Sequence, residues 1–370
     1  MTEQTSKTYR CTSMGSVRLS LAASAVMFVM ATFAGGAWAG KNDLQLLNLC
    51  LQAPSLSLAS KPECSWVQRR QADGWITGPV VPDLNGRQDF RSLMSELGVV
   101  LAPRIPMVAD TAGFGGFQLS AELGLTEISR SRKYWDGVAG VSAGNREAAR
   151  PDPMLTTVGA FVRKGIWLPV PTIELGFGVV HLLDSQLLAW QSYAKVAIHE
   201  GFHDWPVPSF AVRGAVSYLT GTDQVTMTTT SVDLLISKGF GLLGTARLEP
   251  FAGWSWISIF AHSGRLDATP SCDAAQLAAL PAGSDPGNQY CASSQAGTKN
   301  DFNANFSFPD QNAITRYRVF AGFKLRFAIV FFAAQYEVFF AGSSRDGNAS
   351  SARDQSATQN ALSLSTGLDF

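Results

Sequence analysis

Alternation of apolar and polar side chains is the feature that most constrains how this sequence folds. In residues 317–327, Tyr317 and Phe323 share one face of an extended chain, whereas Arg318 and Lys324 share the other. Successive side chains of a β-strand point to opposite faces, so this pattern predicts strands with one apolar and one polar face. The same pattern predicts further strands at 93–103, 117–126, 154–166, 172–179, 190–198, 208–219, 225–237, 245–260, 329–341 and 361–370.

Two architectures fit such strands, a soluble β-sandwich and a transmembrane β-barrel. After residue 39, no apolar run reaches the roughly 20 residues of a transmembrane helix. Aromatic residues favour the barrel, because they fall on the apolar face, several near strand ends, as in a membrane-interface girdle. These residues are Trp190, Tyr218, Trp254, Trp256, Tyr317 and Tyr336. A soluble secreted β protein is the alternative.

Connection lengths also favour the barrel. The connections at 168–171 and 237–241 are short. Long connections are expected at 129–153, 263–312 and 342–360. Outer-membrane barrels have short turns at one end and long external loops at the other.

The end of the chain carries the most specific pattern. Apolar residues alternate through residues 361–370, and the chain stops on an aromatic residue. This segment resembles the C-terminal strand of Gram-negative outer-membrane β-barrel proteins, which the barrel-assembly machinery reads. The matching positions are Leu362, Leu364, Leu368 and Phe370, with Thr366 a weaker match. The resemblance implies an outer-membrane location, with lipid, periplasmic chaperones and the barrel-assembly machinery as partners, but it matches no particular functional family.

The strand count leaves two alternatives for this all-β antiparallel barrel. Ten strands follow residue 113, and 93–103 adds an eleventh. A closed barrel with both termini on the periplasmic side needs an even number. A weak strand within 75–81 would give about twelve, which we expect, whereas ten result if 93–103 is not a separate span.

The N-terminus predicts export. Basic residues precede an apolar run at 19–34, and Ala37-Trp38-Ala39 matches the small-x-small pattern of a signal-peptidase site. We therefore expect residues 1–39 to be a cleaved signal peptide; a membrane anchor is the alternative, although the run is short for one. Residues 40–88 are expected in the periplasm or as a plug in the lumen, and residues 89–370 as the barrel.

Cysteine usage agrees with an oxidising compartment. Four cysteines remain after the expected cleavage, and they form two sequence-local pairs. Three pairings are possible, and the local one is favoured because it closes short loops. The favoured disulfides are Cys50–Cys64 and Cys272–Cys291.

Charged residues on the polar face of the strands are expected to line the lumen. A charged side chain facing lipid costs about 2–4 kcal/mol at the bilayer midplane. The regular placement of these charges on one face of the strands therefore indicates an enclosed polar interior. The expected lumen residues are Glu122, Glu174, Lys195, Arg213, Asp233, Glu249, Arg316, Arg318, Lys324, Arg326, Glu337 and Asp369. Two functions follow: a passive, porin-like channel for small solutes, or a filled barrel whose external loops, especially 263–312, contact a ligand or partner.

Enzymatic, metal-dependent and nucleic-acid-binding functions are not expected. The chain has 29 basic and 29 acidic residues, so it lacks the positive charge of a nucleic-acid-binding protein. His199-Glu200-Gly201-Phe202-His203 matches the H-E-x-x-H letters of a zinc protease, but that chemistry needs a helix. Here Gly201 and the preceding alternation favour a strand running into a turn. No catalytic residue, metal or cofactor is assigned.

Overall fold

The computed structural model describes residues 40–49, 84–104, 106–113, 115–140, 150–166, 172–200, 207–242, 244–267, 305–347 and 352–370. The helical elements are η1 (Leu46–Leu49), α3 (Leu84–Val100) and η2 (Lys133–Gly137). The strands are β1 (Phe117–Glu127), β2 (Met154–Ile166), β3 (Ile173–Leu182), β4 (Leu188–His199), β5 (Ser209–Thr220), β6 (Val225–Ser237), β7 (Phe240–Leu242), β8 (Ala246–Ser263), β9 (Leu266–Asp267), β10 (Asn305–Phe306), β11 (Gln311–Phe327), β12 (Val330–Phe339) and β13 (Gln359–Asp369).

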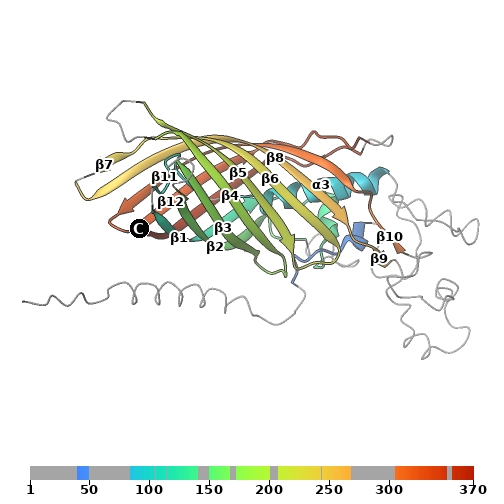
Figure 1. Ribbon diagram of the computed structural model, residues 1–370. Coiled ribbons are helices and arrows are strands. Elements are labelled where there is room, and N and C mark those ends of the chain that lie inside the picture. Colours follow the sequence, from blue (N-terminus) through green and yellow to red (C-terminus); the bar gives the residue numbers. More distant parts are fainter. Residues whose placement is uncertain are drawn as a thin grey trace, which may run out of the picture. The chain divides into compact units, whose positions relative to one another are not determined.

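Ten of these strands close into an antiparallel barrel (Figure 1). The order around the barrel is β1-β2-β3-β4-β5-β6-β8-β11-β12-β13, and β13 pairs with β1 to complete the circle. The short strand β7 pairs only with the start of β8, and β9 and β10 form a separate two-stranded sheet. Closure leaves no open edge among the ten wall strands.

The antiparallel pairing gives the barrel two distinct ends. We call the end where β1 finishes and β2 begins the loop end; β3, β5, β8 and β12 also finish there. We call the opposite end the turn end. It contains the start of β1, the two-residue connection from β11 to β12, and Phe370, whose backbone pairs with Phe117.

The predicted alternation is realised in the wall strands. In β5, for example, Ala211, Arg213 and Ser217 are buried, whereas Phe210 and Tyr218 are exposed on the outer surface. The six tryptophan and tyrosine residues predicted for the girdle all lie on the outer surface. The outer face is therefore apolar and aromatic, and the inner face carries the polar residues.

The expectation of twelve strands is wrong, and the barrel has the ten strands of the alternative. Residues 93–100, predicted to begin a strand, belong instead to α3. Phe90, Leu93, Leu97 and Val100 have helical spacing and lie on one face of that helix. The barrel wall therefore begins at Phe117 and not at residue 89.

Described residues before β1 occupy the lumen. Figure 1 shows α3 inside the ring of strands. Every residue from Phe90 to Arg104 is buried, polar and apolar alike. We call residues 84–104 and 106–113 the lumen segment. Polar residues on α3 face a polar wall rather than water. The sequence of α3 therefore lacks the one-sided apolar pattern of a surface helix.

Candidate functional site

The lumen is the candidate functional site because the charged residues converge there. The structure places all twelve residues predicted to face the lumen on the inner face of the barrel. Most are deeply buried; Arg326 is the most exposed, with a side-chain exposure of 39%. These residues are joined by ion pairs and by contacts with the lumen segment.

A charge network crosses the middle of the lumen. Arg318 on β11 forms ion pairs with Asp233 on β6 at 2.9 Å and with Glu337 on β12 at 3.0 Å. Asp233 also pairs with Arg213 at 2.6 Å. All four side chains are almost completely buried. Such a network is costly to open, because loss of one member leaves an opposite charge buried without its partner.

The helical half of the lumen segment is anchored near the loop end by a buried carboxylate. Glu96 on α3 accepts hydrogen bonds from the Ser129 backbone N–H, the Tyr134 hydroxyl and the Trp135 indole N–H, at 3.0, 2.6 and 2.8 Å. Tyr134 and Trp135 belong to η2, which follows β1 at the loop end. Burial raises the pKa of the Tyr134 hydroxyl, and the neighbouring Glu96 carboxylate raises it further.

Arginine side chains hold the outer part of α3. Arg91 donates hydrogen bonds to Gln311 at 3.0 Å and to the Ser344 hydroxyl at 2.9 Å. Arg316 on β11 donates to the hydroxyls of Ser95 and Ser356 at 2.9 and 2.8 Å. These contacts connect the helix to strands and connections at the loop end.

The middle of the lumen segment is bound through its backbone carbonyls. Gln191 on β4 and Ser217 on β5 both donate to the Leu101 carbonyl, at 3.1 and 2.8 Å. Arg318, besides its ion pairs, donates to the Pro103 carbonyl at 3.1 Å. The side chain of Arg104 in turn donates to the Thr126 hydroxyl on β1 and to the Val100 carbonyl.

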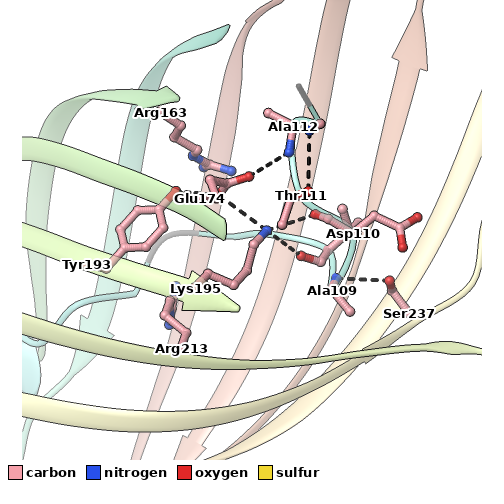
Figure 2. Close-up of polar contacts among 12 residues, drawn as sticks. Ala109, Asp110, Thr111, Ala112, Arg163, Glu174, Tyr193, Lys195, Arg213 and Ser237 are labelled. Atoms are coloured by element: carbon pink, nitrogen blue, oxygen red, sulfur yellow. Dashed lines mark hydrogen bonds and ion pairs between the residues drawn. The ribbon is translucent and has the colours of Figure 1, made fainter. Parts of the chain in front are cut away.

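The part of the lumen segment nearest the turn end is held in the same way (Figure 2). Lys195 donates to the Val108 and Asp110 carbonyls at 3.2 and 2.8 Å and pairs with Glu174 at 3.2 Å. Glu174 also accepts from the Tyr193 hydroxyl at 2.7 Å and from the Ala112 N–H at 2.9 Å. Wall side chains thus satisfy both donors and acceptors of an extended backbone.

Two further wall contacts complete this part of the site. Ser237 accepts a hydrogen bond from the Ala109 N–H at 2.9 Å. Glu200, just beyond β4, accepts one from the Thr111 N–H at 2.9 Å. Together with Lys195, these residues fix the extended chain to β4 and β6.

A polar cavity of 270 Å³ opens beside the lumen segment near the turn end. Its lining includes four carboxylates and five cationic side chains, which are Arg163, Lys195, Arg247, Lys324 and Arg326. Lys324 pairs with Asp369 at 2.8 Å, and Arg247 with Glu249 at 2.6 Å. The cavity is large and polar enough to hold water.

The residues that match the zinc-protease motif begin at the end of β4. His199 is the last residue of β4, and Glu200 binds Thr111; His203 lies outside the described residues. Within the described ranges, no three His, Cys, Asp or Glu side chains gather as a metal site. Nor does any described helix have the length and apolar character needed to cross a membrane.

Some predicted features fall outside the described residues. These are the expected signal peptide at 1–39, the suggested strand at 75–81 and the cysteines Cys50, Cys64, Cys272 and Cys291. Leu362, Leu364 and Leu368 lie in β13, whose partners β12 and β1 close the barrel, and Phe370 follows it. Their role in assembly stays a prediction.

Sequence reasoning missed several residues of the site. Arg163 on β2 is buried in the lumen and forms an ion pair with Glu122 at 3.5 Å. It shares the inward phase with Phe161, so the strand alternation could have found it. Glu96 and Arg104 could not have been found in this way, because they lie on the lumen segment and not on a wall strand.

Comparison with known proteins identifies no family. No family model matches the sequence, and no curated protein matches it significantly. Solved structures with a similar arrangement are outer-membrane β-barrel proteins. The crystal structure of Neisserial surface protein A is 11% identical, with 69% of this chain and 99% of that chain covered and a TM-score of 0.26.

Two other structures are similar at the same low level. Ail, the attachment invasion locus protein of Yersinia pestis, in complex with the heparin analogue sucrose octasulfate, is 10% identical, with 70% and 99% coverage and a TM-score of 0.24. The translocator domain of autotransporter NalP from Neisseria meningitidis is 10% identical, with 70% and 89% coverage and a TM-score of 0.29. The fold assignment rests on the strand pairing of this chain and not on these values.

Proposed function

We propose that this protein is an outer-membrane β-barrel that is closed by its own chain and acts through the surface at its loop end. The outer-membrane location is supported by the apolar, aromatic outer face of the barrel and by the long connections gathered at one end. The alternation of apolar residues in 361–370, which resembles a strand of such barrels, supports the same location.

The single observation that carries the closed state is the binding of the lumen segment's backbone by wall residues. Ser217, Arg318 and Lys195 bind it at successive points from Leu101 to Asp110. These donors come from the neighbouring strands β4 and β5 and from β11, which lies three strands beyond β5 in the ring. A chain held from two parts of the wall leaves little of a ten-stranded lumen for solute to pass.

Because the lumen is filled, we assign the function to the loop end. Connections after β1, β8 and β12 meet there, and they include η2 and the β9–β10 pair. Loops held on a rigid scaffold commonly carry binding functions. The passive channel is the competing function, and it requires the lumen segment to leave the lumen or to yield around the turn-end cavity.

Single-channel conductance of the refolded protein in a planar bilayer tests this proposal. Heat-modifiable gel mobility first establishes that the protein is folded, and a known porin inserted in parallel controls for bilayer quality. We expect no discrete conductance steps at high salt from the wild-type chain. Reproducible, ion-selective steps from folded wild-type protein would support the channel and contradict the closed barrel.

A further inference from the structure

Residues 40–49 do not lie near the start of β1, although they precede it in the chain. Asn42 donates through its backbone N–H to the Asp184 carbonyl at 3.0 Å and through its side chain to the Leu183 carbonyl at 2.9 Å. Leu183 and Asp184 connect β3 to β4 at the loop end. Residues 40–49 therefore dock on the end of the barrel opposite to the start of β1.

Other contacts also place residues 40–49 at the loop end. Leu44 forms a β-bridge with Val138, next to η2, and the Gln45 N–H donates to the Gly137 carbonyl at 2.8 Å. The Leu46 N–H donates to the Gln224 side chain, which lies in the β5–β6 connection, at 2.6 Å. Leu44, Leu46 and Leu49 are buried, so residues 40–49 are packed against the barrel unit and not merely near it.

The lumen segment then runs from the loop end to the turn end. Near the middle of α3, Arg91 binds Ser344 and Gln311 at the loop end. Farther along, Ala112 binds Glu174 near the turn end, and β1 begins at Phe117 beside the C-terminal Phe370. Glu96 and Leu101 still bind residues at or near the loop end, so the extended residues from Leu101 to Ala112, at about 3.3 Å each, cover most of the distance to the turn end.

We infer that the lumen segment carries the chain across the membrane, so that the barrel displays residues 40–49 on the outer side. The inference rests on the proposed outer-membrane location, in which the long connections face outward. It places residues 40–49 in the same external surface as η2 and the β3–β4 and β5–β6 connections. It replaces the periplasmic placement that the sequence left open for this part of the chain.

Natural lysines allow a test on the unmodified protein in intact cells. Lys41 and Lys133 lie at the loop end, whereas Lys164 and Lys238 lie at the turn end. An amine-reactive ester joined to dextran by a cleavable linker is too large to cross the outer membrane. After cleavage of the linker, peptide mass spectrometry identifies each modified lysine.

The inference expects Lys41 to be modified in intact cells to an extent similar to Lys133. Lys164 and Lys238 should be modified only after the outer membrane is permeabilised. A Lys41→Arg variant keeps the ion pair with Asp152 and removes the reactive amine. Loss of the modified peptide in this variant assigns the modification to Lys41. An Asp152→Asn variant releases the Lys41 amine in case that 2.5 Å contact shields it.

The outcomes separate this inference from the proposed function. Modification of Lys133 without modification of Lys41, even in the Asp152→Asn variant, would overturn the display of residues 40–49 and leave the barrel orientation intact. Modification of Lys238 in place of Lys133 would show the reverse orientation. Absence of both until permeabilisation would contradict an outer-membrane protein with an external loop end.

Discussion

The two halves of the lumen segment are held in the lumen by different means. The helical half, α3, satisfies its own backbone hydrogen bonds and packs through buried side chains such as Phe90 and Leu93. The extended half, from Leu101 to Ala112, offers bare backbone groups that wall residues such as Lys195 and Ser217 bind. The comparison teaches that a helix in a barrel meets the wall through its side chains alone, whereas an extended chain also needs wall donors and acceptors for its backbone.

The largest effect is expected from breaking the central charge network, which supports the extended half. Arg318→Met removes the partner of Asp233 and Glu337 and the donor to the Pro103 carbonyl. Two buried carboxylates lose a cation, so we expect the free energy of unfolding to fall by about 3–5 kcal/mol. Urea titration followed by heat-modifiable mobility measures this loss.

The matched control for that prediction is Arg326→Met. Its side chain is 39% exposed, and its ion pair with Asp369 is 3.7 Å long. A half-exposed pair contributes about 0–1 kcal/mol. Equal destabilisation by the two substitutions would contradict a special role for the central network.

Cavity formation should weaken the helical half. Leu93 is completely buried and packs closely against Gly137 and η2. Leu93→Ala should lower the free energy of unfolding by about 2–4 kcal/mol, within the usual range for buried leucines. Hydrogen exchange should quicken in α3 more than in residues 109–112. Gln88→Ala on the outer part of α3 is the control, and an equal effect from it would contradict the packing argument.

Replacing the buried carboxylate tests the polar anchor of α3. Glu96→Gln keeps the shape but turns one acceptor into a donor, so at least one of Ser129, Tyr134 and Trp135 loses its acceptor. A buried unsatisfied donor costs about 1–3 kcal/mol. Urea titration should show a loss in this range, and a double variant with Tyr134→Phe should lose less than the sum of the single changes.

Alkaline pH should test the same anchor through Tyr134. Because burial and the Glu96 charge raise the folded-state pKa of Tyr134, its contribution is constant below the unfolded-state pKa of about 10. As pH rises further, the unfolded chain loses this proton first, so stability falls by up to about 1.4 kcal/mol per pH unit. Tyr134→Phe should flatten the slope between pH 10 and 11 in urea titrations; an unchanged slope would contradict the shift.

The smallest effect is expected from a single hydrogen bond to the extended half. Ser217→Ala removes one donor to the Leu101 carbonyl, while Gln191 remains as the other. We expect a loss of about 0.5–1.5 kcal/mol. Thr220→Ala, which removes a hydrogen bond to the Leu188 carbonyl within the wall, serves as the comparison. Only Ser217→Ala should speed hydrogen exchange in the lumen segment.

The wall of the barrel could be predicted from the sequence because each strand has two different environments. In β5, Phe210 and Tyr218 on the outer face and Arg213 and Ser217 on the lumen face show the two environments directly. From Phe90 onward, residues on α3 meet protein on every side, so Arg91, Glu96 and Leu97 are equally buried and give no such contrast. The apparent alternation at 93–103 therefore predicts a strand where the chain forms a helix.

The partners of the lumen residues were less predictable than their orientation. Strand phase places Lys195 and Glu174 inside, but no local pattern indicates that Lys195 binds the Val108 and Asp110 carbonyls, 87 and 85 residues away. Those contacts depend on the path of a segment without regular structure. A polar lumen predicted from phase therefore left open whether water or protein fills it.

Hydrogen–deuterium exchange of the folded protein in detergent tests the central claim most directly. The account predicts slow exchange for the amides of α3 and for Ala109, Thr111 and Ala112, whose N–H groups bind Ser237, Glu200 and Glu174. Slow exchange of the wall strands in the same sample shows that the barrel is intact. Exchange of the lumen segment within seconds, as in a free peptide, would contradict a barrel closed by its own chain.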